Sequence, residues 1–212
     1  MSQDELPYRY RWPRPAVTVD CLIYALRGFQ PNILLIRRKH DPCMGSWALP
    51  GGFVDENEGL EVAAQRELEE ETSVKGCPMV QTGAYGDPGR DPRGHTVTVA
   101  FMGWVPSVDC GVRAADDAAD ARFFPITRLP PMAFDHMQII KDAWARCVFR
   151  SFGGRVYNLN LGESGPSGIH VLDKATEQEL HSFETAGEGF GGVEPLSAAL
   201  GTIVPFESAQ ST

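Results

Sequence analysis

The chain has 212 residues, 42% of them hydrophobic, which is enough to bury one core with little room for a second domain. Its 19 basic and 28 acidic residues give a net charge of -9, which opposes nonspecific binding to nucleic acid or to an anionic membrane. The five cysteines are scattered without the close pairs of a zinc or CxxC redox site, so we expect reduced thiols in a cytoplasmic protein. The N-terminus has no signal-peptide pattern, and no segment is apolar enough to span a bilayer.

The first elements in chain order are two strands and a helix. Residues 16–26 and 32–38 are apolar, β-branched runs separated by a Gly-containing turn, which predicts a hairpin of buried strands. A loop rich in Pro and Gly follows. From Glu58 to about Thr72 the residues are strong helix formers without Pro, and Asn57 is a suitable N-cap.

The second half of the predicted domain returns to strands. A strand after Pro78 leads into a long Gly- and Pro-rich loop, GAYGDPGRDPRGH, of a length that usually has a function or is disordered. Strands are predicted over 95–105 and 121–125, and a helix over 134–146. Strands alternating with two helices favour an α/β (α+β) architecture, with a mixed sheet between helices.

The C-terminal residues differ in composition from the rest. Residues 149–212 are rich in Gly and Ser and acidic in balance, and their short apolar pieces, such as RVYNLNL and GIHVL, predict no definite fold. These pieces could add strands to a partner's sheet, or the segment could be loop or tail. We therefore predict a catalytic domain over 8–148 and an extension of unknown role over 149–212.

The strongest chemical signal lies on the first predicted helix. Glu67, Glu70 and Glu71 stand at i, i+3 and i+4, so a helix would place all three carboxylates on one face. Such a face is often only a solvated surface. Here it belongs to a longer pattern, in which Gly52 is followed after five residues by Glu58 and after seven more by Arg66-Glu67-Leu68.

This pattern resembles the Nudix box, G-x5-E-x7-R-E-U-x-E-E-x-G-U, where U is a bulky aliphatic residue. Eight of its nine specified positions match across the 23 residues from Gly52 to Val74. The departure is Ser73 in place of the last Gly, just past the helix end, where Gly is favoured because a left-handed backbone costs it nothing. The resemblance implies the Nudix fold, with the box as a loop-helix-loop unit.

Carboxylates gathered on one face suit the hydrolysis of a diphosphate. Hard oxygen ligands bind Mg²⁺, with Mn²⁺ as a substitute, and the cation offsets charge on the phosphoryl oxygens. We therefore predict metal ligands at Glu67, Glu71 and Glu70, with Glu70 alternatively the general base. The resemblance implies the Gly52 carbonyl as a further ligand and supporting roles for Glu58 and Arg66. In several Nudix subfamilies the base comes from a loop outside the box, for which the candidates are Asp116, Asp117 and Asp120.

The segments around the box resemble the ADP-ribose pyrophosphatase branch of the family, from about residue 8 to residue 146. This resemblance implies a Mg²⁺-dependent enzyme that cleaves ADP-ribose to AMP and ribose 5-phosphate. An adenine and a diphosphate call for an aromatic platform and positive charge. The predicted substrate-binding residues are Arg37, Trp47, Arg90, Phe134 and His136. Trp47 and Phe134 could instead be core aromatics, and of Arg37 and its strand neighbour Arg38 only one can face the site.

Other functions stay open on the sequence. Other Nudix substrates include an oxidised nucleoside triphosphate, a dinucleoside polyphosphate and NADH, although the SQPWPFPxS array of the NADH-cleaving branch is absent. Some Nudix-related transcription factors only sense ADP-ribose, but these tend to have degenerate boxes and a basic C-terminal winged helix, whereas this tail is acidic. We expect a small-molecule nucleotide as partner, with no nucleic acid or membrane, and, from the family, a homodimer.

Overall fold

The computed structural model describes residues 10–114, 118–145, 151–152, 155–160, 168–173, 175–176 and 178–184. The elements of the first and larger part, in chain order, are β1 (Ala16–Arg27), β2 (Gln30–Arg38), β3 (Trp47–Ala48), β4 (Gly51–Phe53), α1 (Leu60–Thr72), β5 (Met79–Tyr85), β6 (Thr96–Trp104), β7 (Ala118–Pro125) and α2 (His136–Ala145). Four further strands follow α2, namely β8 (Ser151–Phe152), β9 (Arg155–Asn160), β10 (Gly168–Asp173) and β11 (Glu179–Glu184).

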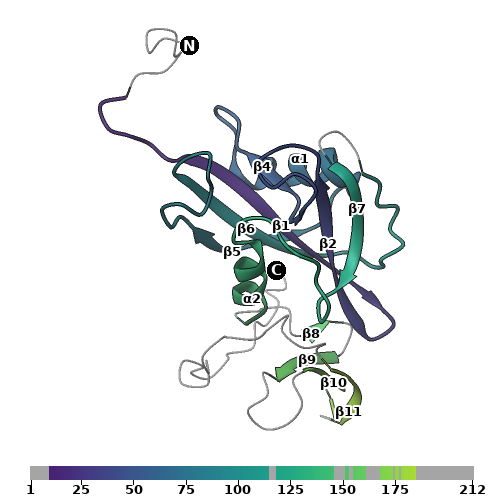
Figure 1. Cartoon of the computed structure of the whole chain (residues 1–212). Helices are drawn as coiled ribbons and strands as arrows, with labels where there is room; N and C mark the ends of the chain where they lie inside the picture. Colours follow the sequence, from purple (N-terminus) through teal and green to yellow (C-terminus); the bar gives the residue numbers. More distant parts are fainter. Residues whose placement is uncertain are drawn as a thin grey trace, which may run out of the picture.

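The larger part is built on one mixed sheet. Its central order is β3-β2-β1-β6-β5, with β4 paired to β1 and β7 paired to β2. The β1–β6 pair is parallel, and the other pairs in this sheet are antiparallel. The helices α1 and α2 lie on opposite sides of the sheet (Figure 1). The predicted architecture, a mixed sheet between helices, is confirmed.

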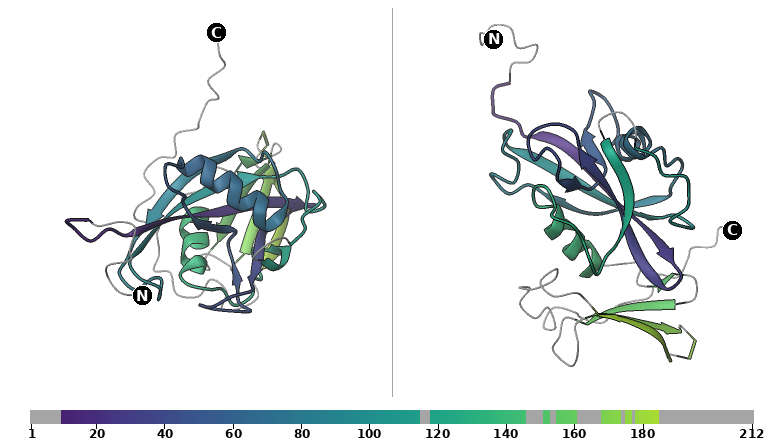
Figure 2. Two further views of the ribbon diagram at one scale, coloured as in Figure 1. Left: turned by 90° about the horizontal axis from the view of Figure 1, so that it is seen from above. Right: turned by 45° about the vertical axis from the view of Figure 1, so that its right-hand side comes forward.

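Strand β1 is buried on both faces because a helix covers each of them. One set of its alternating residues, including Cys21 and Ile23, packs with Leu68 and other residues of α1. The other set, including Leu22 and Tyr24, packs with the apolar face of α2. This explains why the sequence shows a continuous apolar run here instead of a polar alternation. Figure 2 shows α1 lying across the sheet in the view from above.

Helix α1 begins two residues later than predicted. Gly59 is the N-cap residue and makes no side-chain capping bond, whereas the predicted cap, Asn57, lies in the preceding turn with φ of 63°. The Asn57 cap was therefore wrong. At the other end Ser73 adopts the left-handed conformation, with φ of 62°, and its N–H donates to the Glu69 carbonyl at 2.8 Å. Ser at this position therefore takes the backbone conformation that favours Gly.

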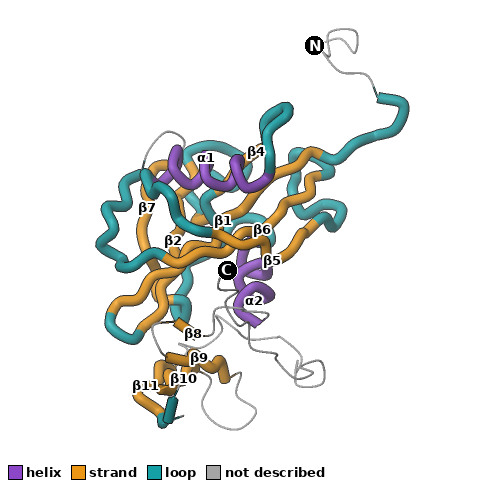
Figure 3. The backbone as a smooth tube through the Cα atoms, turned by 180° about the vertical axis from the view of Figure 1, so that it is seen from behind, coloured by secondary structure: helices purple, strands orange, loops and turns teal. Residues whose placement is uncertain are grey.

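The C-terminal strands form a separate sheet of their own. Its order is β11-β10-β9-β8, with every neighbour antiparallel. The two apolar pieces noted in the sequence are β9 and β10, which pair with each other from Gly168 opposite Asn160 to Asp173 opposite Arg155. In Figure 3 this small sheet follows α2, away from α1. The predicted domain boundary at residues 148 and 149 falls outside the described residues.

Two further findings bear on the expected class of protein. No helix in the described ranges is long and apolar enough to cross a membrane. The four cysteines within those ranges, Cys21, Cys43, Cys77 and Cys110, are all free thiols.

Candidate active site

A cleft opens where the C-terminal end of β2 meets the Gly51–Gly52 loop. It consists of a cavity of about 350 Å³ against α1 and a small adjoining hollow of about 30 Å³ toward α2. The two share four lining residues, which are Arg38, Gly51, Gly52 and Arg93. Glu67 and Glu71 line the larger cavity, while Phe134 and His136 line the smaller one. The cleft therefore joins the box helix to the wall formed by α2.

Two consecutive glycines allow the floor of this cleft to form. Gly51 pairs with Asp20, and a Cβ on Gly51 would lie 2.0 Å from the Val19 carbonyl oxygen. A Cβ on Gly52 would lie 2.4 Å from Oε1 of Glu67. Any side chain at either position would force the backbone or the carboxylate to move. The glycines thus let the Glu67 carboxylate lie directly against the main chain.

Arg66 ties the box together through its whole guanidinium group. Its Nε and Nη2 donate to the two carboxylate oxygens of Glu58, both at 2.8 Å, and Nη2 also donates to the Phe53 carbonyl at 3.0 Å. Its Nη1 donates to Glu67 at 2.8 Å and to Glu70 at 3.1 Å. Hydrogen bonds from Arg66 lower the pKa of Glu58 to about 2. Arg66 is therefore not an ordinary surface arginine.

The three box glutamates differ in environment although they share one helix face. Glu71 is only 8% exposed, and its Oε2 accepts a hydrogen bond from the Gly51 N–H at 2.9 Å. Burial raises the Glu71 pKa to about 8, and burial also raises the pKa of Glu67, against the opposing effect of Arg66. Glu70 is exposed and does not line either part of the cleft. Glu67 and Glu71 point inward, while Glu70 lies at the rim.

The box glutamates alone are not grouped as the ligands of a metal ion are. Among the described residues, no three His, Cys, Asp or Glu side chains gather as they would around a metal ion. Arg66 instead links Glu67 and Glu70, and Glu71 turns to the Gly51 amide. Two desolvated carboxylates, of which Glu67 lies directly against the Gly52 backbone, nevertheless offer the hard oxygen donors that suit a divalent cation.

Two arginines that were not predicted as substrate-binding residues line the cleft. The Cζ of Arg38 lies 5.0 Å from the centre of the Phe134 ring, and that of Arg93 lies 4.9 Å from the Phe53 ring. Both arginines line both parts of the cleft. Arg93 is held in place by a paired hydrogen bond to the buried Asp91. The alternation along β2 indicated that one of its two arginines faces the site, and it is Arg38.

Three of the predicted substrate-binding residues have other partners. Arg37 is exposed, donates to the Gly45 carbonyl at 3.0 Å and does not line the cleft. Trp47 packs edge-on against Phe124 with ring centres 4.6 Å apart, and it too lies away from the cleft lining. The Arg90 side chain is 6% exposed and makes two hydrogen bonds to Asp135, at 2.6 and 2.8 Å. These three residues therefore act first as structural contacts.

A buried polar network forms part of the lining of the smaller part of the cleft, around Asp20 of β1. Thr98 of β6 donates to Asp20 at 2.6 Å, the Arg90 guanidinium lies 3.9 Å away, and Nε2 of His136 lies 3.5 Å away. The other ring nitrogen of His136, Nδ1, accepts a hydrogen bond from the Leu49 N–H at 2.9 Å. Burial lowers the pKa of His136, which keeps the ring neutral. Both ring nitrogens thus face protein atoms.

Of the three carboxylates predicted as alternative bases, only Asp120 lies within the described residues. Asp116 and Asp117 lie outside the described residues. Asp120 is on β7 and pairs with Arg122 of the same strand.

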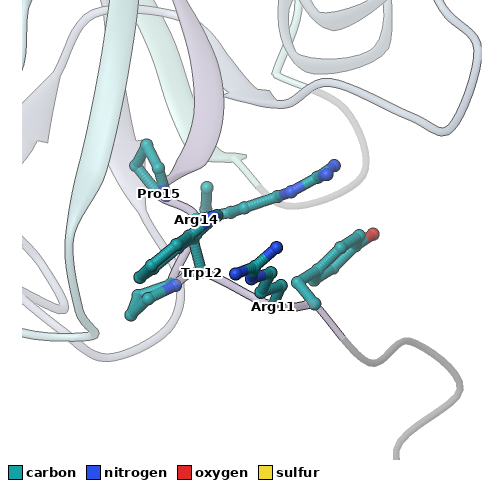
Figure 4. Close-up of a pocket in the computed structure, with 7 residues that line it drawn as sticks. Arg11, Trp12, Arg14 and Pro15 are labelled. Atoms are coloured by element: carbon teal, nitrogen blue, oxygen red, sulfur yellow. The ribbon is translucent and has the colours of Figure 1, made fainter.

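A further hollow, of about 670 Å³, is lined by seven consecutive residues from Tyr10 to Ala16 (Figure 4). Its contacts are local, with Arg14 stacked on Tyr10 at 3.9 Å and Arg11 over Trp12 at 5.3 Å. Trp12 is 70% exposed. A hollow lined by one extended segment has no wall from another element, so its larger size does not make it the better candidate site.

Comparison with known proteins agrees with this geometry. Residues 14–143 match the NUDIX domain family. The chain belongs to the NUDIX family. An ADP-ribose pyrophosphatase of Methanocaldococcus jannaschii is 44% identical over 137 residues, which cover 63% of this chain and 76% of that protein. Together, these matches identify the chain as a Nudix pyrophosphohydrolase.

Two further proteins are also similar to this chain. The ADPR responsive transcriptional repressor NtrR of Acinetobacter baylyi is 33% identical over 139 residues, or 64% of this chain, which spans only 55% of the repressor's length. The NUDIX domain of Shewanella oneidensis NrtR, solved as a cocrystal with ADP ribose, is 31% identical with a TM-score of 0.61. That match covers 69% of this chain and 99% of the solved chain.

Proposed function

We propose that this Nudix hydrolase cleaves the pyrophosphate bond of ADP-ribose in a Mg²⁺-dependent reaction, giving AMP and ribose 5-phosphate, with Mn²⁺ able to replace Mg²⁺. The observation that carries the proposal is the cleft floor, where Gly52 leaves room for the Glu67 carboxylate and Glu71 is desolvated beside it. Burying carboxylates without a cation is costly, as the raised pKa of Glu71 indicates.

The residues that would hold the cation are Glu67, Glu71 and the Gly52 carbonyl, which come from α1 and β4. When bound, Mg²⁺ supplies positive charge to the phosphoryl oxygens and lowers the pKa of water. Arg66 holds Glu67 through a charge-assisted hydrogen bond and so orients it toward the floor of the cleft. Glu70 is exposed and accepts a hydrogen bond from Arg66, and we assign to it the two predicted alternatives, general base or further metal ligand.

Recognition of the substrate is assigned to the opposite side of the cleft. Arg38 and Arg93 supply positive charge beside the box carboxylates, which suits the diphosphate. Phe53 and Phe134 already stack against these two guanidinium groups, so their rings are suited to contact a flat base or ribose. This revises the predicted set, in which Phe134 stays while Arg38 and Arg93 take the roles first given to Arg37 and Arg90.

The choice of ADP-ribose is supported by the relatives' names. One relative is an ADP-ribose pyrophosphatase, and the NUDIX domain of Shewanella oneidensis NrtR was solved with ADP ribose bound. A sensing function is the rival, and it has support from the similarity to NtrR. The complete glutamate set favours hydrolysis, and the described part of the C-terminal extension consists of strands, without the winged helix that a DNA-binding regulator was expected to carry.

The test is hydrolysis of ADP-ribose and a panel of other nucleotides, with Mg²⁺ or with EDTA, followed by chromatography of the products. Glu67→Gln and Glu71→Gln each remove one charge at nearly constant shape, and we expect each to lower kcat by about 100-fold. Glu69→Gln is the matched control, because Glu69 lies on the same helix, is exposed and pairs with Lys75.

Each result of this test has a distinct meaning. AMP formed from ADP-ribose, lost with EDTA and in both cleft variants but kept in Glu69→Gln, would support the full proposal. Turnover of a different panel member would keep the chemistry and change the substrate. ADP-ribose binding without turnover of any panel member would favour the sensor. The expected homodimer stays a prediction, which sedimentation of the purified chain would check.

A further inference from the structure

We infer that His136 is a positioning residue that links the buried Asp20 to the backbone of the metal-binding loop. The inference rests on the proposed function, because it concerns how the Gly52 carbonyl is presented to a cation. His136 was predicted from the sequence to contact the substrate. Its contacts instead run from β1 through the start of α2 to the loop that precedes Gly51.

The ring of His136 has a defined orientation. The Leu49 N–H donates to Nδ1, so the proton of the neutral ring sits on Nε2, facing Oδ1 of Asp20 at 3.5 Å. Leu49 lies 87 residues away in sequence and is itself buried. An acceptor for this amide therefore has to come from a distant element, and His136 supplies it.

The Leu49 amide lies two residues before Gly51, the first of the two glycines of the cleft floor. Pro50 follows Leu49 and has no N–H, and its carbonyl accepts from the Cys21 N–H at 2.7 Å. The next amide, Gly51 N–H, donates to Glu71. His136 thus fixes the loop from the α2 side, while Glu71 fixes it from the α1 side. Gly52 follows these two anchored amides directly in the chain and is itself paired with Val19 of β1.

Asp20 gives this arrangement its stability because it has three neighbours of its own. Thr98 donates to its Oδ2, and Arg90 stands nearby while bound to Asp135, the residue next to His136. Oδ1 of Asp20 therefore faces the His136 ring at 3.5 Å, and its Oδ2 lies 3.9 Å from the Arg90 guanidinium. Removing the ring would leave the buried Leu49 amide without its acceptor and the buried Asp20 without the ring nitrogen that faces it.

Two substitutions test the roles of the two ring nitrogens separately. Asn places an amide at the level of Nδ1, so His136→Asn keeps an acceptor for Leu49 and loses the reach to Asp20. Gln places its amide at the level of Nε2, so His136→Gln keeps the contact with Asp20 and loses the acceptor for Leu49. Ile140→Val is the matched control, because it trims a buried apolar side chain of the same helix that cannot take part in the hydrogen bonds of the network.

The experiment measures amide hydrogen exchange at Leu49 and Gly51 by NMR and the Mg²⁺ concentration that half-saturates ADP-ribose hydrolysis. We expect His136→Gln to speed exchange at both amides by at least about 10-fold and to raise the half-saturating Mg²⁺ concentration by about 10-fold. Ile140→Val should stay within about 2-fold of the unmodified protein in both measurements, and His136→Asn, which keeps the Leu49 acceptor but loses the link to Asp20, should show a smaller effect than His136→Gln in both.

Equal effects of the Asn and Gln variants, or unchanged Leu49 exchange in His136→Gln, would overturn the inference. If His136→Gln fails to fold, Asp20→Asn replaces it, because Asn keeps an acceptor for Thr98 while weakening the hold on the ring. Faster Leu49 exchange in Asp20→Asn supports the inference, and unchanged exchange overturns it. If the unmodified protein hydrolyses none of the nucleotides, the proposed function fails, whereas the exchange measurements still decide whether His136 anchors the loop.

Discussion

The two walls of the cleft are built in different ways. On the α1 side, Glu58, Arg66, Glu67, Glu70 and Glu71 lie within 14 residues of one another, and Arg66 bonds directly to three of them. On the α2 side, the contacts join residues 45 to 87 positions apart, such as Arg90 with Asp135 and Leu49 with His136. The first wall follows from helical spacing, whereas the second exists only after the sheet has formed. Substitutions on the two walls should therefore have different consequences.

The largest expected effect concerns Glu71 and the stability of the metal-free protein. Its pKa rises from an ordinary value of 4.5 to about 8 on folding, so the folded state binds its proton more tightly. This contribution to stability is complete below about pH 4.5 and is lost as pH rises toward 8. The free energy of unfolding should fall by up to about 1.4 kcal/mol per pH unit across that window.

Urea unfolding in EDTA at several pH values checks this prediction. Glu71→Gln is neutral at every pH and should remove the slope, while Glu69→Gln should retain it. Added Mg²⁺ should stabilise the unmodified protein more as pH rises, because the cation competes with the proton for Glu71. A slope that persists in Glu71→Gln would assign the titration to another group.

The next effect is on catalysis, through the glycine that lets the α1 wall meet the backbone. In Gly52→Ala the new Cβ would lie 2.4 Å from the Glu67 carboxylate, which must then shift. A displacement of this size in a ligand set should lower kcat by about 100-fold. Gly59→Ala is the control, because Gly59 has φ of -76° and its nearest neighbour to a new Cβ is 3.9 Å away. Similar kcat values in the two variants would contradict the assigned role of Gly52.

A smaller effect, on the KM for ADP-ribose, should distinguish the two neighbouring arginines of β2. Arg38→Ala removes a charge that faces both parts of the cleft, so the KM for ADP-ribose should rise by about 10-fold. Arg37→Ala removes an exposed side chain that bonds to the Gly45 carbonyl, and its KM should change by less than about 2-fold. Steady-state kinetics measures the KM for ADP-ribose of both variants. A larger rise in KM for Arg37→Ala than for Arg38→Ala would support the prediction from the sequence that Arg37 binds the substrate.

The smallest expected effect is at the end of α1, where Ser73 departs from the box pattern. Its φ of 62° is in the left-handed region, so Ser73→Gly should relieve strain and stabilise the protein by about 0.5 kcal/mol. Thermal unfolding measures this, and hydrolysis should be unaffected. A loss of stability would mean that the Ser side chain makes a compensating interaction.

Much of the α1 wall was predictable because its information is local. The spacing of the glutamates placed them on one helix face, and the hairpin and the second helix were found from runs of apolar residues. The N-cap was not, because Asn57 has the right chemistry but stands in a turn two residues before the helix cap. Local residue preferences predicted that this helix exists, but they did not predict the residue at which it begins.

The α2 wall was predicted by residue type but not by role. Arg90 and His136 were expected at the substrate because their side chains suit a phosphate or a polar pocket, yet both are buried against Asp20 and Asp135. No feature of the sequence near Leu49 indicates that its amide needs an acceptor from residue 136. Alternation on β2 restricted the choice to Arg37 or Arg38, but it did not say which face meets the cleft.

The amino-acid sequence alone determined the family, the layered architecture and the carboxylate face of α1, because these depend on spacing along a single element. The tertiary structure decided which charged side chains are open to the cleft and which are engaged in the hydrogen bonds and ion pairs that hold its wall in place. Arg38 and Arg93 line both parts of the cleft, whereas Arg90 and His136 line only the smaller part and have their polar atoms turned to Asp135 and Asp20. The reason is physical, since the burial and partners of a side chain depend on elements brought together from distant parts of the chain.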